Sequence, residues 1–191
     1  MDEQQERSLV QSAQGGDRDA FEMLMQAHYQ QVYRVACRLL RSHDDTDVVT
    51  QEVFLQAFRS LRQFDGRSRL MTWLYTITVR KATDQQRRLK ARPPMKAMHE
   101  GLAVDLRRPV NPDPPAEAHR VDMAQMVGEA IRRLPPDHRS AVALVVQEGV
   151  PYREAARMLG CSLGTVAWRV WDAKRLLKEM LAGRISSEDV A

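Results

Sequence analysis

The sequence predicts an all-α protein built from two small helical domains that a linker joins. Its 191 residues are 43% hydrophobic but only 6% aromatic, with 9 glycines, a composition that favours helices over a β-sandwich. Apolar residues recur at helical spacing in both halves. Prolines gather between residues 93 and 115, where that spacing fades, as in an extended linker. We therefore expect domains at 1–92 and 123–182, a linker at 93–122 and a C-terminal tail at 183–191.

The first half predicts a bundle of helices. A weak apolar pattern indicates a short helix over residues 6–14, and Asp17, after two glycines, is suited to cap a long helix that reaches Leu40. The acidic residues 44, 45 and 47 predict the first turn of the next helix, because the helix dipole favours acids there. That helix is expected to carry Val48, Leu55, Phe58 and Leu61 on or near one face and to end before Gly66. A last helix is expected over 70–92, with Leu70, Trp73, Leu74 and Ile77 pointing inward.

The second half predicts a helix-turn-helix. Helices are expected over 121–134, from Pro136 to residue 148, from Pro151 onward, and over 163–181, with Gly149 ending the second of these. Ala156, Gly160 and Val166 have the spacing that lets two helices approach, turn and lock together. The inward stripe of the last helix is Val166, Val170, Ala173 and Leu177.

The opposite face of that last helix is polar and aromatic. It is expected to carry Gly164, Thr165, Trp168, Arg169 and Asp172, followed by the basic residues Lys174, Arg175 and Lys178. Such side chains reach base edges and phosphates in DNA. Trp171 is expected in the core, beside Val170. Trp168 is expected to face outward, against DNA or another domain.

The segment 64–88 combines a glycine-containing loop, aromatic residues and a basic helix. From residue 80 to residue 98, seven basic side chains stand against Asp84 alone: Arg80, Lys81, Arg87, Arg88, Lys90, Arg92 and Lys96. Single-stranded nucleic acid binds such surfaces by stacking bases on aromatics while basic side chains follow the phosphates. The alternative is that Trp73 belongs to the core and the arginines are only a solvated helix end.

Composition excludes several classes of function. The formal net charge of +4 weakly favours an anionic partner, and no apolar run or leader predicts a membrane span or secretion, so we expect a soluble intracellular protein. Cys37 and Cys161 are expected to be ordinary, partly buried thiols, with a redox sensor as the alternative. The stretch GCSLGT lacks the lysine of a phosphate-binding loop, and the histidines have no paired ligand spacing. We expect no enzyme, metal, cofactor or small-molecule substrate.

Two stretches of the sequence carry a resemblance to a known family. The first is DDTDVVTQEVFLQAFRSLRQF with the following WLYTITVRKATDQQRR, and the second runs from residue 130 to residue 177 and holds PYREAARMLGCSLGTVAWRV. They are similar to region 2 and region 4, respectively, of a bacterial sigma factor of the sigma-70 family. No region 3 lies between them, which is the plan of the extracytoplasmic-function (ECF) group, group IV. The resemblance implies a factor that binds core RNA polymerase, recognises the −35 and −10 promoter elements and promotes DNA melting for transcription initiation.

The resemblance also implies roles for particular residues. Contacts to the β′ clamp helices of the polymerase fall on Asp47, Gln51, Glu52 and Phe54, although Phe54 in the core is the alternative. Contacts to the −10 element fall on Phe64, Arg67, Ser68, Arg69, Trp73, Arg80, Lys81, Asp84, Arg87 and Arg88, with the loop before Leu70 capturing a flipped base. Contacts to the −35 element fall on Ser162, Gly164, Thr165, Trp168, Arg169, Asp172, Lys174 and Arg175.

Three residues depart from the family pattern. Arg80 stands where an asparagine is usual, Trp168 where a small polar residue is common, and Asp172 where a second basic residue is usual. An aspartate accepts a hydrogen bond from the cytosine amino group and repels phosphate. We therefore expect promoter elements that differ from those typical of the family.

The resemblance implies further partners. We expect contact with the β flap, promoter DNA, a linker that threads toward the polymerase active site, and inhibition by an anti-sigma factor in a stress response. Such a protein acts in the bacterial cytoplasm, where a membrane-bound anti-sigma factor would hold it at the inner membrane. The alternative function is a stand-alone helix-turn-helix regulator whose N-terminal domain binds an effector or dimerises.

Overall fold

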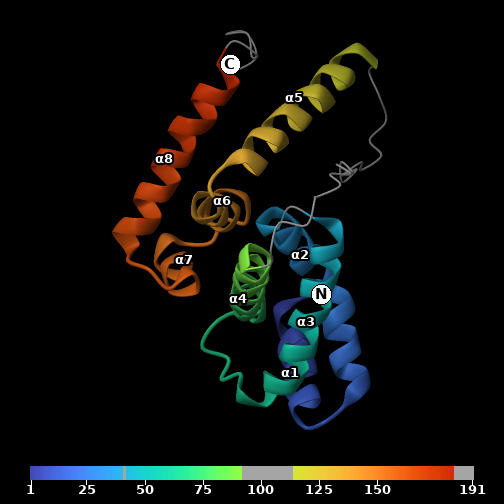
Figure 1. Ribbon diagram of the computed structural model, residues 1–191. Coiled ribbons are helices and arrows are strands. Elements are labelled where there is room, and N and C mark those ends of the chain that lie inside the picture. Colours follow the sequence, from blue (N-terminus) through green and yellow to red (C-terminus); the bar gives the residue numbers. More distant parts are fainter. Residues whose placement is uncertain (41, 92–113, 183–191) are drawn as a thin grey trace. The chain divides into compact units, whose positions relative to one another are not determined.

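The computed structural model describes residues 1–40, 42–91 and 114–182, with side chains from residue 123 onward in the last range. The chain divides into two compact units, residues 1–98 and 99–191. In the described ranges every regular element is a helix, as the sequence predicts (Figure 1). No helix within these ranges has both the length and the apolar character that crossing a bilayer needs. The predicted linker lies, for residues 93–113, outside the described part, as does the tail at 183–191.

The N-terminal unit consists of α1 (Glu3–Gln14), α2 (Arg18–Leu39), α3 (His43–Ser60), the short 3₁₀ turn η1 (Leu61–Gln63) and α4 (Leu70–Ala91). Helix α1 begins three residues before its predicted start, because Asp2 and Gln5 form a reciprocal capping box. Asp17 caps α2 as predicted, accepting from the backbone of Asp19 and Ala20. The boundaries of α2 and α4 and the start of α3 agree with the sequence to within about two residues, whereas α3 ends at Ser60, before its predicted end near Phe64, and the chain continues as η1.

The core of this unit lies where α2, α3 and α4 meet (Figure 1). Val32 and Val35 of α2 and Val53 of α3 are fully buried there. Leu70, Leu74 and Ile77 of α4 point inward as predicted, whereas Trp73 is half-buried. The buried Thr50 and Thr78 satisfy their hydroxyls by donating to the carbonyl oxygens of Thr46 and Leu74 one turn earlier.

The C-terminal unit consists of α5 (Pro114–Arg133), α6 (Pro136–Val142), the single π-helical turn η2 (Ala143–Gln147), α7 (Tyr152–Leu159) and α8 (Leu163–Leu181). The prediction that the linker extends to residue 122 is wrong, because α5 begins at Pro114. Proline is tolerated in the first turn of a helix, where its missing N–H would have no partner. The single helix expected after Pro136 is present, but its second half widens into η2 before Gly149 ends it.

Helices α7 and α8 form the predicted helix-turn-helix. Gly160 ends α7 with φ +61, a left-handed conformation that glycine adopts without strain. Ser162 then caps α8 by accepting from the backbone of Thr165. Ala156 is 7% exposed and Val166 is fully buried, so the two helices pack as the spacing predicts. A cluster of Leu134, Val142 and Ala173 joins α5, α6 and α8.

The predicted core position of Trp171 is wrong, since this side chain is 62% exposed. Successive residues of a helix are separated by about 100°, so a neighbour of the buried Val170 is carried to the flank of the helix. Trp168 faces outward as predicted and is 54% exposed.

Candidate polymerase and nucleic-acid interfaces

The loop before α4 is held by short-range contacts that shape its aromatic and basic residues. The rings of Phe64 and Trp73 lie 5.3 Å apart at 44°, so both are partly covered by each other. Asp65 accepts from the backbone of Arg67 at 3.0 Å and pairs with its guanidinium at 3.3 Å. Gly66 has φ +70, which permits the tight turn. The basic residues Arg67 and Arg69 of this loop are exposed, as is Ser68.

One face of α4 continues from this aromatic pair. Trp73, Arg80, Asp84 and Arg87 follow one another at intervals of seven, four and three residues, which places them along one side of the helix. Arg80 and Asp84 are exposed, and Asp84 lies 3.9 Å from Arg87. The arrangement offers an aromatic surface at one end and basic side chains along the helix. This is the form of surface that tracks a single strand of nucleic acid.

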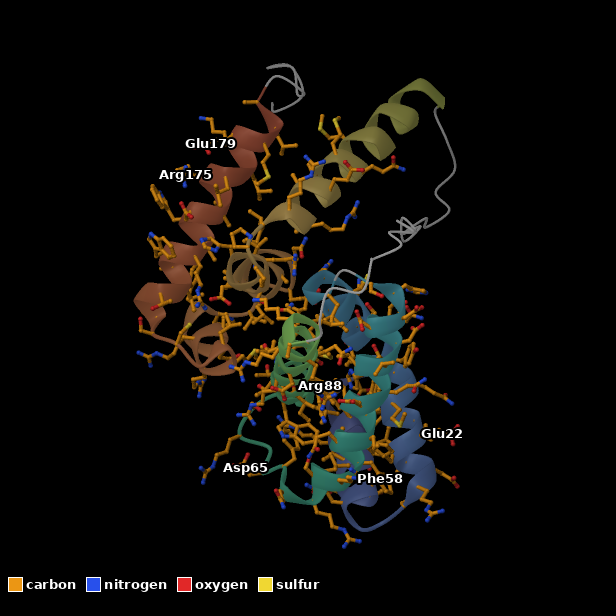
Figure 2. All side chains as sticks on the ribbon, in the orientation of Figure 1. Glu22, Phe58, Asp65, Arg88, Arg175 and Glu179 are labelled. Carbon is orange, nitrogen blue, oxygen red and sulfur yellow. The ribbon has the colours of Figure 1, made fainter. Side chains whose placement is uncertain are left out.

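Glu52 of α3 pairs with the basic edge of this face. Its carboxylate lies 3.4 Å from Nζ of Lys81 and 3.5 Å from Nη1 of Arg88. Figure 2 labels Arg88 on α4 and Asp65 in the loop that precedes this helix. Glu52, predicted to contact polymerase, is therefore turned toward two predicted DNA contacts in the free protein.

The outer face of α3 combines acidic, polar and apolar side chains. Gln51 is exposed and Asp47 half-exposed, and both share this face with Val48, Leu55 and Phe58. Those three apolar side chains are 46%, 51% and 51% exposed, so the apolar face expected on this helix is turned outward, with only Leu61 buried. The buried face instead carries Val49, Val53, Phe54 and Ala57.

The prediction that Phe54 presents apolar area to a partner is wrong. Phe54 is 5% exposed and stacks on Tyr29 at a ring distance of 5.9 Å. Two other aromatic rings near α3 are exposed. Phe58 lies edge-on to Phe21 at 5.0 Å and is labelled in Figure 2, and Tyr29 is 40% exposed. Helix α3 is thus apolar on two faces, and only one of them is buried.

In α8 the predicted DNA contacts differ in their exposure and in their contacts within the unit. Trp168, Lys174 and Arg175 are exposed, and Ser162 and Gly164 are exposed at the start of the helix. Thr165 is half-exposed, with its hydroxyl 2.8 Å from that of Ser162. Arg169 and Asp172 are not free. Arg169 pairs with Asp137 at 2.6 Å, and Asp172 lies 3.0 Å from Nε2 of His138.

Both carboxylate oxygens of Asp172 are engaged within the unit in the free protein. Its Oδ1 accepts from Nε and Nη2 of Arg175 at 3.0 and 2.8 Å, while Oδ2 faces His138. The hydrogen bond from Arg175 and the charge of that guanidinium, followed by the hydrogen bond from His138, hold the pKa of Asp172 below its ordinary value. The same bond, with a second that Arg175 donates to Glu179, raises the pKa of Arg175. Figure 2 shows Arg175 and Glu179 one turn apart on α8.

Comparison with known proteins identifies the fold's family. The family model of Sigma-70 region 2 matches residues 24–92, and that of Sigma-70 region 4 matches residues 124–177. The ECF RNA polymerase sigma-E factor of Haemophilus influenzae is 30% identical over 182 residues, which cover 92% of this chain and 95% of that protein. The chain belongs to the ECF sigma factors. Members of this family are transcription initiation factors rather than enzymes.

Other comparisons agree with this assignment. The ECF sigma factor SigM of Mycobacterium tuberculosis is 33% identical over 94% of this sigma factor and 86% of its own length. The sigma-E factor of Escherichia coli K12 is 33% identical over 88% of this chain and 90% of that protein. Among solved structures, CnrH in complex with the cytosolic domain of CnrY matches with a TM-score of 0.65 at 25% identity, covering 95% and 99% of the two chains.

The structure also reveals residues of this sigma factor that the sequence did not single out. Gln14, Asp65, Asp137 and His138 each hold a predicted site residue or the backbone beside it. The capping position of Asp65 before Gly66 is a local signal that the sequence carries. The other three residues contact partners that are 32 to 50 residues away in the sequence, and helical spacing does not predict contacts over such separations.

Proposed function

We propose that this ECF sigma factor docks on core RNA polymerase through the outer face of α3 and opens promoter DNA with the loop and basic face of α4. The observation that carries the first role is the second apolar face of α3, with Leu55 and Phe58 half-exposed beside Gln51. Exposed apolar groups ringed by polar ones are typical of protein interfaces. Asp47 and Gln51 supply the polar contacts to the β′ clamp helices, with Glu52 at the edge nearest α4.

The second role rests on the aromatic pair of Phe64 and Trp73 and on the basic residues that follow them. We assign base capture from the −10 element to the loop of Arg67, Ser68 and Arg69, and phosphate contacts to Arg80, Lys81, Arg87 and Arg88. Flipping a base costs a few kcal/mol of unstacking, so a shaped pocket supplies selectivity as well as melting. Arg80, where asparagine is usual, adds a phosphate contact next to Asp84.

The third role, reading of the −35 element, belongs to α8. Its amino-terminal residues Ser162, Gly164, Thr165 and Trp168 are placed as those of a recognition helix, and Lys174, Arg175 and Lys178 follow on the exposed side. The helix-turn-helix geometry around Gly160 supports this role. The unit would also contact the β flap of the polymerase.

We further propose that the protein works in the bacterial cytoplasm, has no catalytic activity of its own and is held inactive by an anti-sigma factor. A matching solved structure, that of CnrH, contains the cytosolic domain of CnrY, and such a partner would hide the same exposed face of α3. If that anti-sigma factor were bound to the inner membrane, it would keep this protein there until a stress signal released it.

Run-off transcription with purified core polymerase on a genomic library tests the proposal. We expect polymerase-dependent transcripts that start downstream of a shared pair of sequence motifs. The protein alone should bind duplex promoter DNA weakly, whereas a stand-alone regulator would bind it tightly without polymerase. Absence of any start that requires both the protein and the polymerase would remove the proposal.

A further inference from the structure

Helix α6 contacts the recognition helix through two adjacent side chains. Asp137 and His138 lie in its first turn and reach α8, which begins 25 residues later at Leu163. Asp137 Oδ2 accepts from Nη2 of Arg169 at 2.6 Å, and His138 Nε2 lies 3.0 Å from Oδ2 of Asp172. Both partners are polar side chains of the face assigned to DNA.

These contacts restrict the two side chains of α8. The side chain of Arg169 is only 18% exposed and that of Asp172 only 14%, although both project from a DNA-reading helix. The acceptor Asp137 is itself 69% exposed, so it lies at the edge of the surface and not in the core. Arg169 also contacts the sulfur of Cys161 at 3.6 Å, which leaves its guanidinium with a defined direction.

His138 also influences Arg175, through Asp172, and contacts the ring of Trp168. Asp172, held by His138 at one oxygen, accepts from Arg175 at the other, and Glu179 accepts from the same guanidinium at 2.7 Å. The orientation of Arg175 is therefore set jointly by Glu179 and by Asp172 with His138 behind it. The His138 ring also lies edge-on to Trp168 at 5.3 Å. His138 is only 9% exposed, so its ring is held in place beneath the exposed side chains of α8.

We infer that Asp137 and His138 of α6 are positioning residues that set the base preference of the −35 contact. The inference rests on the proposed function of α8. An arginine whose planar fork is already oriented loses less freedom on binding and discriminates more sharply between bases. Asp137 orients Arg169 in this way. His138, through Asp172, orients Arg175 and lets Asp172 serve as a support where the family usually has a second basic residue.

The test uses the full chain bound to core polymerase on a promoter that the wild type transcribes, with its upstream element randomised. Asp137→Asn removes the negative charge that pairs with Arg169, while the size of the side chain at position 137 stays nearly the same. His138→Phe keeps a ring against Trp168 but loses the donor to Asp172. His138→Gln keeps a donor but loses the ring. Glu129→Gln, on the exposed side of α5, is the matched control for loss of one acidic charge.

We expect Asp137→Asn and His138→Phe to change which upstream bases are selected, each lowering discrimination at particular positions about tenfold. The control Glu129→Gln should match the wild type, and His138→Gln should restore most of the wild-type preference. In an Arg169→Ala background, Asp137→Asn should cause no further change. A merely structural role would not move base preference at single positions while leaving the others unchanged.

Identical selection profiles for all variants, or a uniform change in affinity across sequences, would overturn the inference. If a thermal melt shows that His138→Phe does not fold, the selection profile of Asp137→Asn, a change at an exposed position, still tests the inference. If the wild type itself selects no upstream motif, the proposed function of α8 is what fails.

Discussion

Gln14 of α1 donates a hydrogen bond from its side-chain amide to the carbonyl oxygen of Phe64, at 2.8 Å and across 50 residues of sequence. The same nitrogen donates to the carbonyl of Leu61 at 3.0 Å, so both amide protons are used. These bonds fix the turn η1 and the backbone of Phe64, whose ring lies against Trp73. The last turn of α1 thereby positions the loop that we assign to the −10 element.

Gln14→Ala should destabilise the N-terminal unit and impair promoter opening. Two half-buried hydrogen bonds are lost, and at about 1 kcal/mol each the free energy of unfolding should fall by about 1–2 kcal/mol in urea titrations. Permanganate reactivity of the opened −10 strand should decrease more than binding to core polymerase does. Gln11→Ala, at an exposed position of the same helix, is the control. Equal stability of the two variants would contradict a structural role for the hydrogen bonds of Gln14.

Glu52→Gln should strengthen binding of single-stranded DNA. Glu52 neutralises Lys81 and Arg88 in the free protein, at 3.4 and 3.5 Å, and phosphates must displace it. Ion pairs of this exposure are worth less than about 1 kcal/mol, so we expect an affinity gain of about threefold for an oligonucleotide carrying the −10 sequence, with a steeper salt dependence. The matched variant Glu22→Gln removes the same charge from α2 (Figure 2). If both variants gain equally, net charge and not the pairing is responsible.

The two phenylalanines of α3 should separate stability from docking. Phe54→Ala leaves a cavity against Tyr29 and should cost about 3–5 kcal/mol of unfolding free energy, because this ring is buried. Phe58→Ala should leave the fold nearly as stable but weaken the complex with core polymerase at least about tenfold, because exposed aromatic rings at interfaces carry much of the binding energy. Equilibrium unfolding and a fluorescence-anisotropy titration with core polymerase measure the two effects. Normal polymerase binding by Phe58→Ala would exclude this ring from the interface.

Helical spacing and capping residues predicted most of the fold. The stripe of Val166, Val170 and Ala173 and the turn at Gly160 are confirmed, because both signals are local and period-based. The start of α5 at Pro114 differs from the prediction because a proline-rich stretch is typical of a linker but is also compatible with a first helical turn. The face of α3 differs from the prediction for another reason. Periodicity detects apolar stripes but does not say whether a stripe meets the core or a partner.

The candidate site was predictable in its residue types and not in its contacts. Basic and aromatic residues on α4 and α8 follow from the sequence, whereas their pairing with Glu52, Asp137 and His138 depends on how helices pack. Trp171 illustrates the limit within one helix. Its neighbour Val170 is 2% exposed while Trp171 is 62% exposed, so one residue of rotation reverses the prediction.

Acidification should selectively destabilise the C-terminal unit through Asp172. Arg175 and His138 lower the pKa of Asp172 in the folded state. Ionisation of this carboxyl group is therefore more favourable in the folded state than in the unfolded chain, and the ionised form stabilises the fold. This stabilisation is complete above the unfolded value of about 3.9 and is lost as the pH falls through the lower folded value. The wild type should therefore exceed Asp172→Asn in stability at pH 7, and the two should converge at strongly acidic pH.

In a Trp73→Phe background the fluorescence of Trp168 and Trp171 reports this unit alone during urea unfolding. A difference between the two proteins that stays constant with pH would show that the carboxylate's charge plays no part, and Glu129→Gln controls for general charge effects.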